Sequence, residues 1–498
     1  MAEIQDIFII GGGINGTGIA ADAAGRGLSV ILCEQNDLGS GTSSASTKLV
    51  HGGLRYLEHY KFKLVRKALR EREILLKKAP HIIKPIRFLL PHNGMRPEWF
   101  VRLGLFIYDH LGGRKILPPT KTRSLKKGLY AGILEKTYHK AFEYSDCWVD
   151  DSRLVILNAC SARDSGAEIL PKHKCISAIR KNGSWEIILK NRSSGENRIL
   201  KAKVLINAAG PWLDKVISNV LDQHKPSLVR LVKGSHIIVN KLYNHDRSYV
   251  FQGNKGRIIF AIPYQENFTL IGTTDQDFKG DLSNVHIDNS EVEYLCNVSN
   301  EYFKNKISTK DVIGQYAGVR PLYDDGASTA QEATRDFVLK YDKDNLFLNI
   351  IGGKITTYRV LAEKTLNHLT DIFPKMKNNW TVDSTLPGGN FSFDDFDFNL
   401  NKLSHDYPFI NESLLRRYFE NYGTLSWVLL NNINSIGDLG KDFGHGLYEK
   451  EVEYLFINEW AKCAEDILWR RTKLGLHMNT QQIENIDGWF TEKNGVLN

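Results

Sequence analysis

The stretch IFIIGGGINGTGIAADAAGRGLSVILCE, residues 7–34, decides how the chain begins to fold. The apolar run 7–10 predicts a buried parallel strand, because such strands are covered on both faces. The Ala-rich segment 14–25 predicts a helix, and the apolar run 28–33 predicts the next strand. A strand, a helix and a strand in this order indicate an α/β domain with a parallel sheet at the start of the chain.

The turn between the first strand and the helix carries the pattern G-x-G-x-x-G. Gly11 permits a tight turn, Gly13 lets the backbone approach a pyrophosphate, and Gly16 allows the helix to pack closely on the strand. The helix N-terminus, with Asn15 in its first turn, directs free N–H groups at those phosphates. Glu34 ends the second strand, 18 residues after Gly16, where a carboxylate can bind ribose hydroxyls. A glycine-rich turn can also simply join a strand to a helix, but the context and spacing favour a dinucleotide site.

The loop DLGSGTSSASTKLVHGGLRYL, residues 37–57, indicates which dinucleotide binds. It is rich in glycine and small hydroxyl residues, which can follow a ribityl–pyrophosphate chain and donate hydrogen bonds along it. An ordinary surface loop could share that composition, but a histidine, two glycines and an arginine lie close together here. We therefore expect FAD rather than NAD. The candidate contacts in this loop are Thr42, Ser43, Leu49, His51, Gly52 and Gly53.

Composition and charge narrow the classes of protein. A length of 498 residues suggests two or three domains. The net charge of +8 fits an anionic partner, which could be nucleic acid, a membrane surface or an anionic substrate. The six cysteines form no C-x-x-C pair, which argues against a zinc knuckle or a redox dithiol. This cysteine usage indicates a reduced, cytoplasmic setting. No run of about 18 apolar residues occurs, so we expect no membrane-spanning helix.

Later segments predict a second kind of sheet and then a helical region. Residues 175–204 alternate like antiparallel strands, and shorter strand-like runs occur at 204–211, 235–239, 258–262 and 345–354. After about residue 378 no strand-like run is found, and stretches such as 451–475 suit helices. We therefore expect a separate helical domain at the C-terminus.

Motifs along the whole chain carry a resemblance to a known family. They are IIGGGINGTGIAADAAGRGLSV (9–30), TSSASTKLVHGGLRYLEHY (42–60), EYSDCWVDDSRLV (143–155), NAAGPW (207–212), KGSHIIV (233–239), IGTTD (271–275), GVRPL (318–322), GGKITTYR (352–359) and LWRRTKLGL (468–476). Together they resemble the respiratory, quinone-linked FAD-dependent glycerol-3-phosphate dehydrogenases, within the wider D-amino-acid-oxidase-like FAD superfamily.

The resemblance implies a fold of the α/β plus α+β class with three parts. These are a discontinuous Rossmann-type FAD-binding domain (1–85, 140–215 and 340–378), a substrate-binding or cap domain with an antiparallel sheet (86–139 and 216–339), and a helical C-terminal domain (379–498). It also implies that a late strand–turn–helix returns to the flavin. Glycines in that turn would allow close approach, although a threonine at 356 or 357 could instead simply cap a helix. The further cofactor contacts expected from these motifs are Ala209, Gly210, Trp212, Gly353, Lys354, Ile355 and Thr356.

The implied reaction is oxidation of sn-glycerol 3-phosphate to dihydroxyacetone phosphate, with the hydride passing to flavin N5 and electrons passing on to a membrane quinone. The protein must then hold a phosphate dianion, for which Arg and Lys are suited. We expect Arg320 to polarise the reacting oxygen. Substrate contacts are expected from Arg55, Lys354, Tyr56, Thr273 and Arg335. Any one arginine in a chain with 65 Lys and Arg could instead be a solvated surface charge.

Two histidines are candidates for the proton acceptor. An imidazole titrates near neutral pH, which suits proton abstraction. His51 directly precedes a glycine pair, whereas His236 lies in a strand-like run, where a hydrogen-bonded structural histidine is the alternative. The sequence does not choose between them. No spacing of His, Cys or Asp calls for a metal.

Residues 96–116 suggest how the chain could reach a quinone without a spanning helix. Trp99, Phe100, Leu103, Phe106, Ile107 and Leu111 lie beside Arg96, Arg102, Arg114 and Lys115. Such a segment can attach peripherally to an anionic membrane, here the inner face of the cytoplasmic membrane, or it can be a helix packed on its own core.

Three other activities remain open. The same fold could serve an oxygen-dependent glycerol-3-phosphate oxidase, or a flavoprotein that oxidises an amino acid or hydroxy acid. A flavin-dependent RNA-modifying protein is disfavoured, because the cations are scattered and no aromatic RNA-binding pattern accompanies them. We therefore expect no nucleic-acid partner, and the sequence leaves open whether the protein forms a homodimer.

Overall fold

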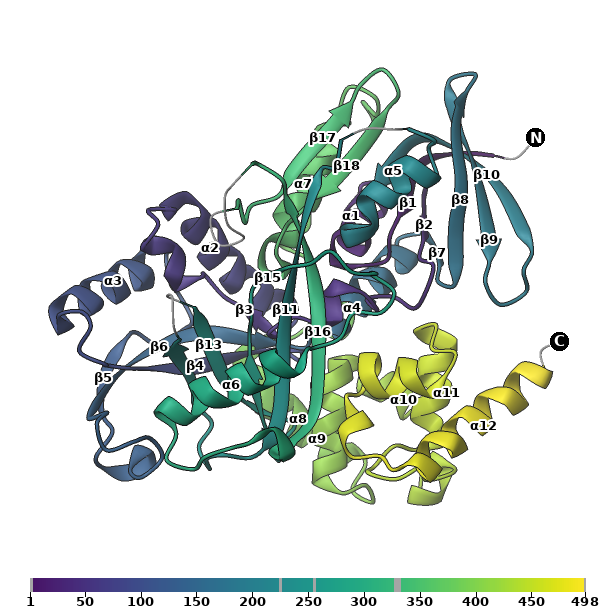
Figure 1. Ribbon diagram of the computed structural model, residues 1–498. Helices are drawn as coiled ribbons and strands as arrows, with labels where there is room; N and C mark the ends of the chain where they lie inside the picture. The colour runs from purple at the N-terminus through teal and green to yellow at the C-terminus, as the bar shows by residue number, and fades with distance from the viewer. Residues whose placement is uncertain (1–2, 224–225, 254–256, 327–332, 497–498) are drawn as a thin grey trace.

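The computed structural model describes residues 3–223, 226–253, 257–326 and 333–496. The chain forms two sheets, flanking helices and a group of C-terminal helices, drawn in yellow-green and yellow (Figure 1). The helices are α1 (Ile14–Gly25), α2 (Phe62–Lys78), α3 (Glu98–Leu111), α4 (Asp151–Asp164), α5 (Leu213–Asn219), α6 (Asn289–Tyr302), α7 (Tyr358–Asn367), α8 (Phe396–Asp406), α9 (Glu412–Tyr422), α10 (Ser426–Leu429), α11 (Glu449–Asn458) and α12 (Thr480–Val496).

The first sheet contains the N-terminal β-α-β unit. Its strands are β1 (Ile4–Ile10), β2 (Val30–Cys33), β7 (Glu168–Leu170), β8 (His173–Lys181), β9 (Ser184–Asn191), β10 (Asn197–Asn207), β17 (Val338–Asp342) and β18 (Phe347–Ile351). In space, β18, β10, β1, β2 and β7 follow one another in parallel. β17 pairs antiparallel with β18, and the hairpin of β8 and β9 extends antiparallel from the first half of β10.

Both faces of β1 are buried, which explains its unbroken apolar run. Ile7 and Ile9 contribute to a core with α1, α4 and α7, whereas Phe8 and Ile10 contribute to a second core with the β8–β9 hairpin and α5. Successive strand residues face opposite sides of a sheet, so four consecutive apolar residues serve two layers. This double burial fixes the end of β1 and the turn that follows it.

The second sheet is mostly antiparallel. Its strands are β3 (Leu49–Val50), β4 (Ile83–Pro91), β5 (Lys121–Ser124), β6 (Lys140–Val149), β11 (Val229–Asn240), β12 (Ser248–Gln252), β13 (Ile258–Tyr264), β14 (Phe268–Gly272), β15 (Gln276–Asp277) and β16 (Val312–Tyr323). A parallel pairing of β4 with β12 joins its two halves. α6 packs on one face through Leu295 and Val298, which lie in a core with Tyr249 and Phe251.

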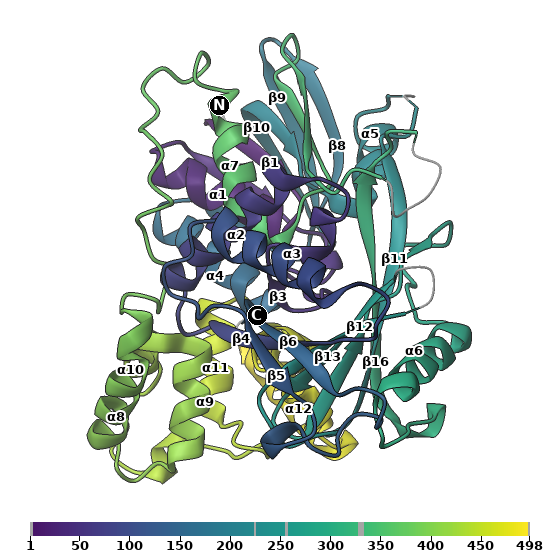
Figure 2. The ribbon, with the colours of Figure 1, turned by 90° about the vertical axis from the view of Figure 1, so that its left-hand side faces the viewer.

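The C-terminal helices have a hydrophobic core of their own, whose buried members run from Leu400 to Phe490. Leu386, by contrast, still packs in the core of the first sheet. One turn of this region, Asp466–Arg471, is a π-helix. In Figure 2 the helices α8 to α11 lie below α1, α2 and α4. The chain returns to its N-terminal part after α11, where Arg471 pairs with Asp37.

The predicted strands 7–10 and 28–33 and the predicted helix 14–25 are confirmed as β1, β2 and α1. The strand predicted at 204–211 is the end of the longer β10 only as far as Asn207, and its earlier residues pair with β9. Residues 208–211 are not strand: they form a turn that leads into the 3-10 helix Gly210–Trp212. The segments expected to build the FAD-binding domain contribute to both sheets. β3 and β6 lie within 1–85 and 140–215 but pair in the second sheet, because antiparallel bonds join them to each other and join β6 to β4.

Candidate active site

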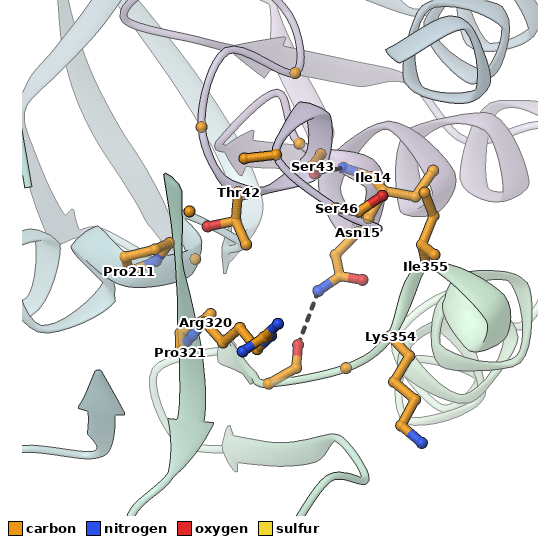
Figure 3. Close-up of a pocket in the computed structure, with 18 of the residues that line it drawn as sticks. Ile14, Asn15, Thr42, Ser43, Ser46, Pro211, Arg320, Pro321, Lys354 and Ile355 are labelled. Carbon is orange, nitrogen blue, oxygen red and sulfur yellow. Dashed lines mark hydrogen bonds between the residues drawn. The ribbon is translucent and has the colours of Figure 1, made fainter. Parts of the chain in front are cut away.

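A cavity of about 1450 Å³ is lined by residues from both sheets. Ligand pockets are typically roughly 300–1,000 Å³, so this one has room for a dinucleotide and a small substrate together. Its wall is made by the β1–α1 turn, the loop 34–59, the turn 208–212, the end of β16 and the turn 352–356. Figure 3 shows Asn15, Ser43, Arg320 and Lys354 approaching this space from separate segments.

The glycines of the first turn are required by close packing. Gly11 has φ +113°, and a Cβ there would lie 2.5 Å from the carbonyl oxygen of Ala208. A Cβ on Gly16 would lie 1.9 Å from the carbonyl oxygen of Gly11, so helix and turn could not approach as they do. Gly13 meets only Ser43 Oγ, at 3.1 Å, and it faces the cavity together with the first turn of α1. The turn therefore presents bare backbone and a helix N-terminus to a ligand.

The wall fits a bound dinucleotide. Asn15 Nδ2 donates a hydrogen bond to the carbonyl oxygen of Gly352 at 3.1 Å, which ties the first turn to the late one (Figure 3). Asn15 Oδ1 is buried and has no hydrogen-bond partner among the described residues, so an acceptor is left for a ligand donor. Ser43 Oγ accepts a hydrogen bond from the backbone N–H of Ile14 at 3.0 Å and holds the loop beside the helix start.

Glu34 lines the cavity directly after β2 ends. Its Oε2 accepts the backbone N–H of Gly12 and its Oε1 accepts that of Asn36, both at 2.8 Å. Burial raises the pKa of this carboxyl group, although these backbone hydrogen bonds oppose the shift. The two bonds set the direction of the carboxylate, which is the orientation that a ribose-binding carboxylate needs.

Cationic and hydroxyl side chains gather on another part of the wall. Arg320 Nη1 donates to Asp275 Oδ1 at 2.6 Å, and its Nη2 donates to Thr273 Oγ1 at 3.1 Å. Arg335 Nη2 lies 3.6 Å from Asp275 Oδ2. Gly234 makes room for the Arg320 guanidinium, because a Cβ there would lie 2.5 Å from Nη2. A glycine of the motif 233–239 thus provides space for Arg320, which lies much later in the sequence.

Lys354 and Tyr56 form a second group on the same wall, with Arg55 beside them. Lys354 Nζ lies 3.8 Å from the centre of the Tyr56 ring. Burial lowers the pKa of Lys354, while Tyr56 opposes that shift. Burial acts to raise the pKa of Tyr56, but Lys354 and Arg335 outweigh it and lower the pKa. Lys354, Arg55, Arg320 and Arg335 thus outnumber Asp275 on this part of the wall, which suits an anionic group.

The structure separates the two candidate histidines. His51 lines the cavity, and burial, with Lys354 and Arg72, lowers its pKa to about 4 against the opposing pull of Asp146. His236 is fully buried and does not line the cavity. Its Nε2 lies 2.9 Å from Thr47 Oγ1, and its ring stacks on Tyr316 at 4.8 Å.

Most predicted site residues meet on one wall. The cavity is lined by Gly11, Gly13, Asn15, Glu34, Thr42, Ser43, Leu49, His51, Gly53, Arg55, Tyr56, Ala209, Gly210, Trp212, Thr273, Arg320, Arg335, Gly353, Lys354, Ile355 and Thr356. Gly16, Gly52 and His236 lie behind it: Gly52 packs on Leu69, for example. Thr356 caps no helix with its side chain, and its Oγ1 accepts the backbone N–H of His51 at 3.3 Å.

Several residues of the wall were not predicted from the sequence. Ile176, at a register shift between β8 and β9, has no distinguishing pattern in the sequence. Arg257 directly precedes β13 and Phe260 lies in it, and the strand-like run 258–262 does not indicate which side faces a ligand. Arg470 lies in the motif 468–476, so the resemblance could have drawn attention to it. Over the described residues, no group of three or more metal-binding side chains is found.

Comparisons with known proteins agree with this geometry. The model of the FAD dependent oxidoreductase family, DAO, matches residues 6–359. The chain is 49% identical to a glycerol-3-phosphate dehydrogenase of Pseudomonas aeruginosa over 488 residues, 97% of this chain and 94% of the relative. It is 48% identical to the D-erythritol 1-phosphate dehydrogenase of Brucella abortus over 497 residues, 99% of each.

A solved structure covers nearly the whole fold. It is the X-ray structure of the glycerol-3-phosphate dehydrogenase from Bacillus halodurans complexed with FAD, with a TM-score of 0.78 and 27% identity. The match covers 99% of this chain and 91% of that one. The glycine turn, the orphan acceptor of Asn15 and the family match together establish FAD as the cofactor. The chain belongs to the family of FAD-dependent oxidoreductases, in which it is a homologue of the glycerol-3-phosphate dehydrogenases.

Proposed function

We propose that the protein oxidises sn-glycerol 3-phosphate to dihydroxyacetone phosphate. The observation that carries this proposal is a group of four cations, Arg55, Arg320, Arg335 and Lys354, that share the cavity wall with Thr273. A phosphate dianion needs several charged donors, and a secondary alcohol beside it needs a polar group at its oxygen. The P. aeruginosa relative carries the matching name.

The arginines have separate tasks in this proposal. Asp275 holds Arg320 in place, so its guanidinium can stabilise the charge that develops on the reacting oxygen. Arg55, Arg335 and Lys354, with Tyr56 and Thr273, bind the substrate phosphate. FAD, when bound, supplies the acceptor for the hydride.

His51 is the proton acceptor in this proposal, and His236 is a structural residue. The lowered pKa keeps the His51 imidazole unprotonated near pH 7, so a ring nitrogen is available to accept the hydroxyl proton, while the same shift weakens the imidazole as a base. His236 is engaged with Thr47 and Tyr316 away from the wall.

The FAD contacts are proposed in the same way. The pyrophosphate lies against Gly11, Gly13 and the start of α1, and the ribose lies against Glu34. The loop residues 42–53 and the turns 209–212 and 353–356 hold the rest of the cofactor.

An anaerobic spectrum tests the substrate. We expect the flavin absorbance of the purified protein to bleach on addition of sn-glycerol 3-phosphate. D-Erythritol 1-phosphate is the second candidate, favoured by the Brucella relative, and differs by one additional CHOH group. The ratio of the two bimolecular reduction rates decides between them. Bleaching by neither compound would refute the proposal, and hydrogen peroxide release without an added acceptor would indicate an oxidase.

We also propose that electrons pass on to a membrane quinone and that α3 attaches the protein to the bilayer. Trp99, Phe100, Leu103 and Phe106 are 68, 47, 47 and 59% exposed on α3. The opposite side of the helix is buried through Leu105 and Tyr108. One side of α3 thus packs on the core, while the other exposes large apolar side chains to solvent. Such an exposed apolar face is typical of a helix that binds the surface of a membrane. In the described ranges, no helix is both long and apolar enough to cross a bilayer.

A further inference from the structure

The C-terminal helices reach the wall of the FAD cavity. Glu465 and Arg470 line it near Glu34 and Asp37, although the match to the FAD-dependent oxidoreductase family ends at residue 359. The loop 37–48, which follows Glu34, runs from this point along the cavity and supplies six of its residues between 39 and 45, among them Thr42 and Ser43.

Two consecutive arginines of the C-terminal helices hold the first end of this loop. Arg470 Nε donates to Asp37 Oδ2 at 2.5 Å, and Arg471 donates from Nη1 to Oδ2 at 2.6 Å and from Nη2 to Oδ1 at 2.9 Å. Asp37 and Arg471 are buried. Burial acts to raise the pKa of Asp37, but the two arginines outweigh it and lower the pKa.

A lysine from the same segment holds the other end. Lys473 Nζ donates to Ser152 Oγ at 2.5 Å and lies 3.5 Å from Asp151 Oδ1. Asp151 also accepts Lys48 Nζ at 2.9 Å and Ser46 Oγ at 2.8 Å. Asp151 therefore connects Lys473 to the last residues of the loop, and all these groups except Ser46 are buried.

We propose that the segment 465–473 is part of the FAD site and acts as a clamp on the loop 37–48. Because of this clamp, FAD binds more tightly when the C-terminal helices are docked, and bound FAD in turn stabilises their docking. Between the clamped ends, Ser43 Oγ accepts the N–H of Ile14 and Thr42 donates to the carbonyl oxygen of Val319 at 2.5 Å. Releasing Asp37 would leave buried charges unpaired and move these contacts at the start of α1. Asp37, Arg471 and Lys473 are thus positioning residues for the cofactor.

FAD binding by the full-length protein tests the clamp. In Arg471→Lys the charge stays, but the bidentate fork to Asp37 is lost. We expect the FAD dissociation constant to rise by roughly 5- to 150-fold, the usual range for coupled sites. Arg417→Lys is the matched control, because Arg417 makes a bidentate pair with the buried Glu451 inside the same helices and lies away from the cavity. It should leave the FAD dissociation constant unchanged.

A second test uses the wild-type protein, so it can be done even if Arg471→Lys does not fold. It follows from the reciprocal coupling between FAD binding and docking of the helices. Coupling is reciprocal, so FAD must slow amide hydrogen exchange of residues 466–474 relative to the same protein after FAD removal. Slower exchange at 11–16 shows that FAD has bound, whatever substrate the enzyme uses. The clamp is overturned if a folded Arg471→Lys variant binds FAD as tightly as wild type. Equal exchange of 466–474 with and without FAD would overturn it as well.

Discussion

Arg320 Nη1 donates a hydrogen bond to Asp275 Oδ1 at 2.6 Å inside the cavity. Burial lowers the pKa of Arg320, while Asp275 opposes that shift and fixes the direction of the guanidinium. Thr273 Oγ1 accepts from Nη2 at 3.1 Å. An arginine held in this way is preorganised, so it can stabilise a developing oxyanion without moving.

Arg320→Ala should therefore slow anaerobic reduction of the flavin by about 100-fold or more, the usual effect of removing one such donor. FAD content should stay at the wild-type level, because the proposal assigns Arg320 to the substrate and not to the cofactor. Stopped-flow absorbance with sn-glycerol 3-phosphate measures the rate. An unchanged rate in a fully loaded variant would remove Arg320 from the mechanism.

Gly13→Leu should give folded protein without FAD. Its side chain would start beside Ser43 Oγ and occupy the space that the pyrophosphate needs. The ratio of flavin to protein absorbance reports the loss. Gly104→Leu on α3 is the control, since a Cβ at Gly104 meets nothing within 4 Å. A full flavin content in Gly13→Leu would contradict the proposed approach of the cofactor.

The two histidines should respond differently to the same substitution. His51→Gln should slow flavin reduction by roughly 100-fold or more, because general bases contribute about 10²–10⁴-fold. His236→Gln should lower the melting temperature, because it disturbs a buried ring that contacts Thr47 and Tyr316. Its reduction rate per bound flavin should stay at the wild-type value. The reverse pattern of rates would make His236 the base.

Changing Trp99, Phe100 and Phe106 together to Ser should reduce vesicle binding and quinone turnover. Activity with a soluble dye should persist, because these side chains are exposed and lie outside the cavity wall. Flotation with anionic vesicles measures the binding. Leu105→Ser on the buried side of α3 is the contrasting change and should destabilise the fold. Wild-type vesicle affinity in a stable triple variant would place the membrane contact elsewhere.

Acid should destabilise the protein partly through His81. Burial, with Arg153, lowers the pKa of His81 to about 3, and neither ring nitrogen has a hydrogen-bond partner among the described residues. The unfolded state takes up a proton below about pH 6.5 and the folded state does not until about pH 3, so stability falls as pH falls through this window. From pH 7 to pH 5 this one group should cost about 2 kcal/mol of unfolding free energy.

Denaturant unfolding of His81→Leu at the two pH values measures that contribution. The pH dependence of the unfolding free energy should weaken by about 2 kcal/mol, because the titrating group is gone. His405→Leu is the control, since His405 is 91% exposed on its side chain and meets solvent in the folded state too. An identical pH dependence in His81→Leu and wild type would show that His81 is not responsible.

The local sequence determined the β-α-β unit and its chemistry. Residues 7–34 contain a strand buried on both faces, a glycine turn and a helix. The structure of this short stretch therefore depends mainly on residues that are close together in the sequence. Gly11, Gly13 and Glu34 could be predicted on the cavity wall because their roles depend on that turn. The arginines and lysines of the motifs were identifiable by type and by resemblance, although their partners were not.

Only the tertiary structure decided which of these groups meet. His51 and His236 both lie beside glycines or strands in the sequence, but the packing of β11 against β14 and β16 buries His236 behind the wall. Asp37 and Arg471 are separated by 434 residues, and no local pattern joins them. Such ion pairs between distant residues depend on how whole layers pack. A buried charge without a partner is costly, so the packing that buries Asp37 must also bring an opposite charge beside it.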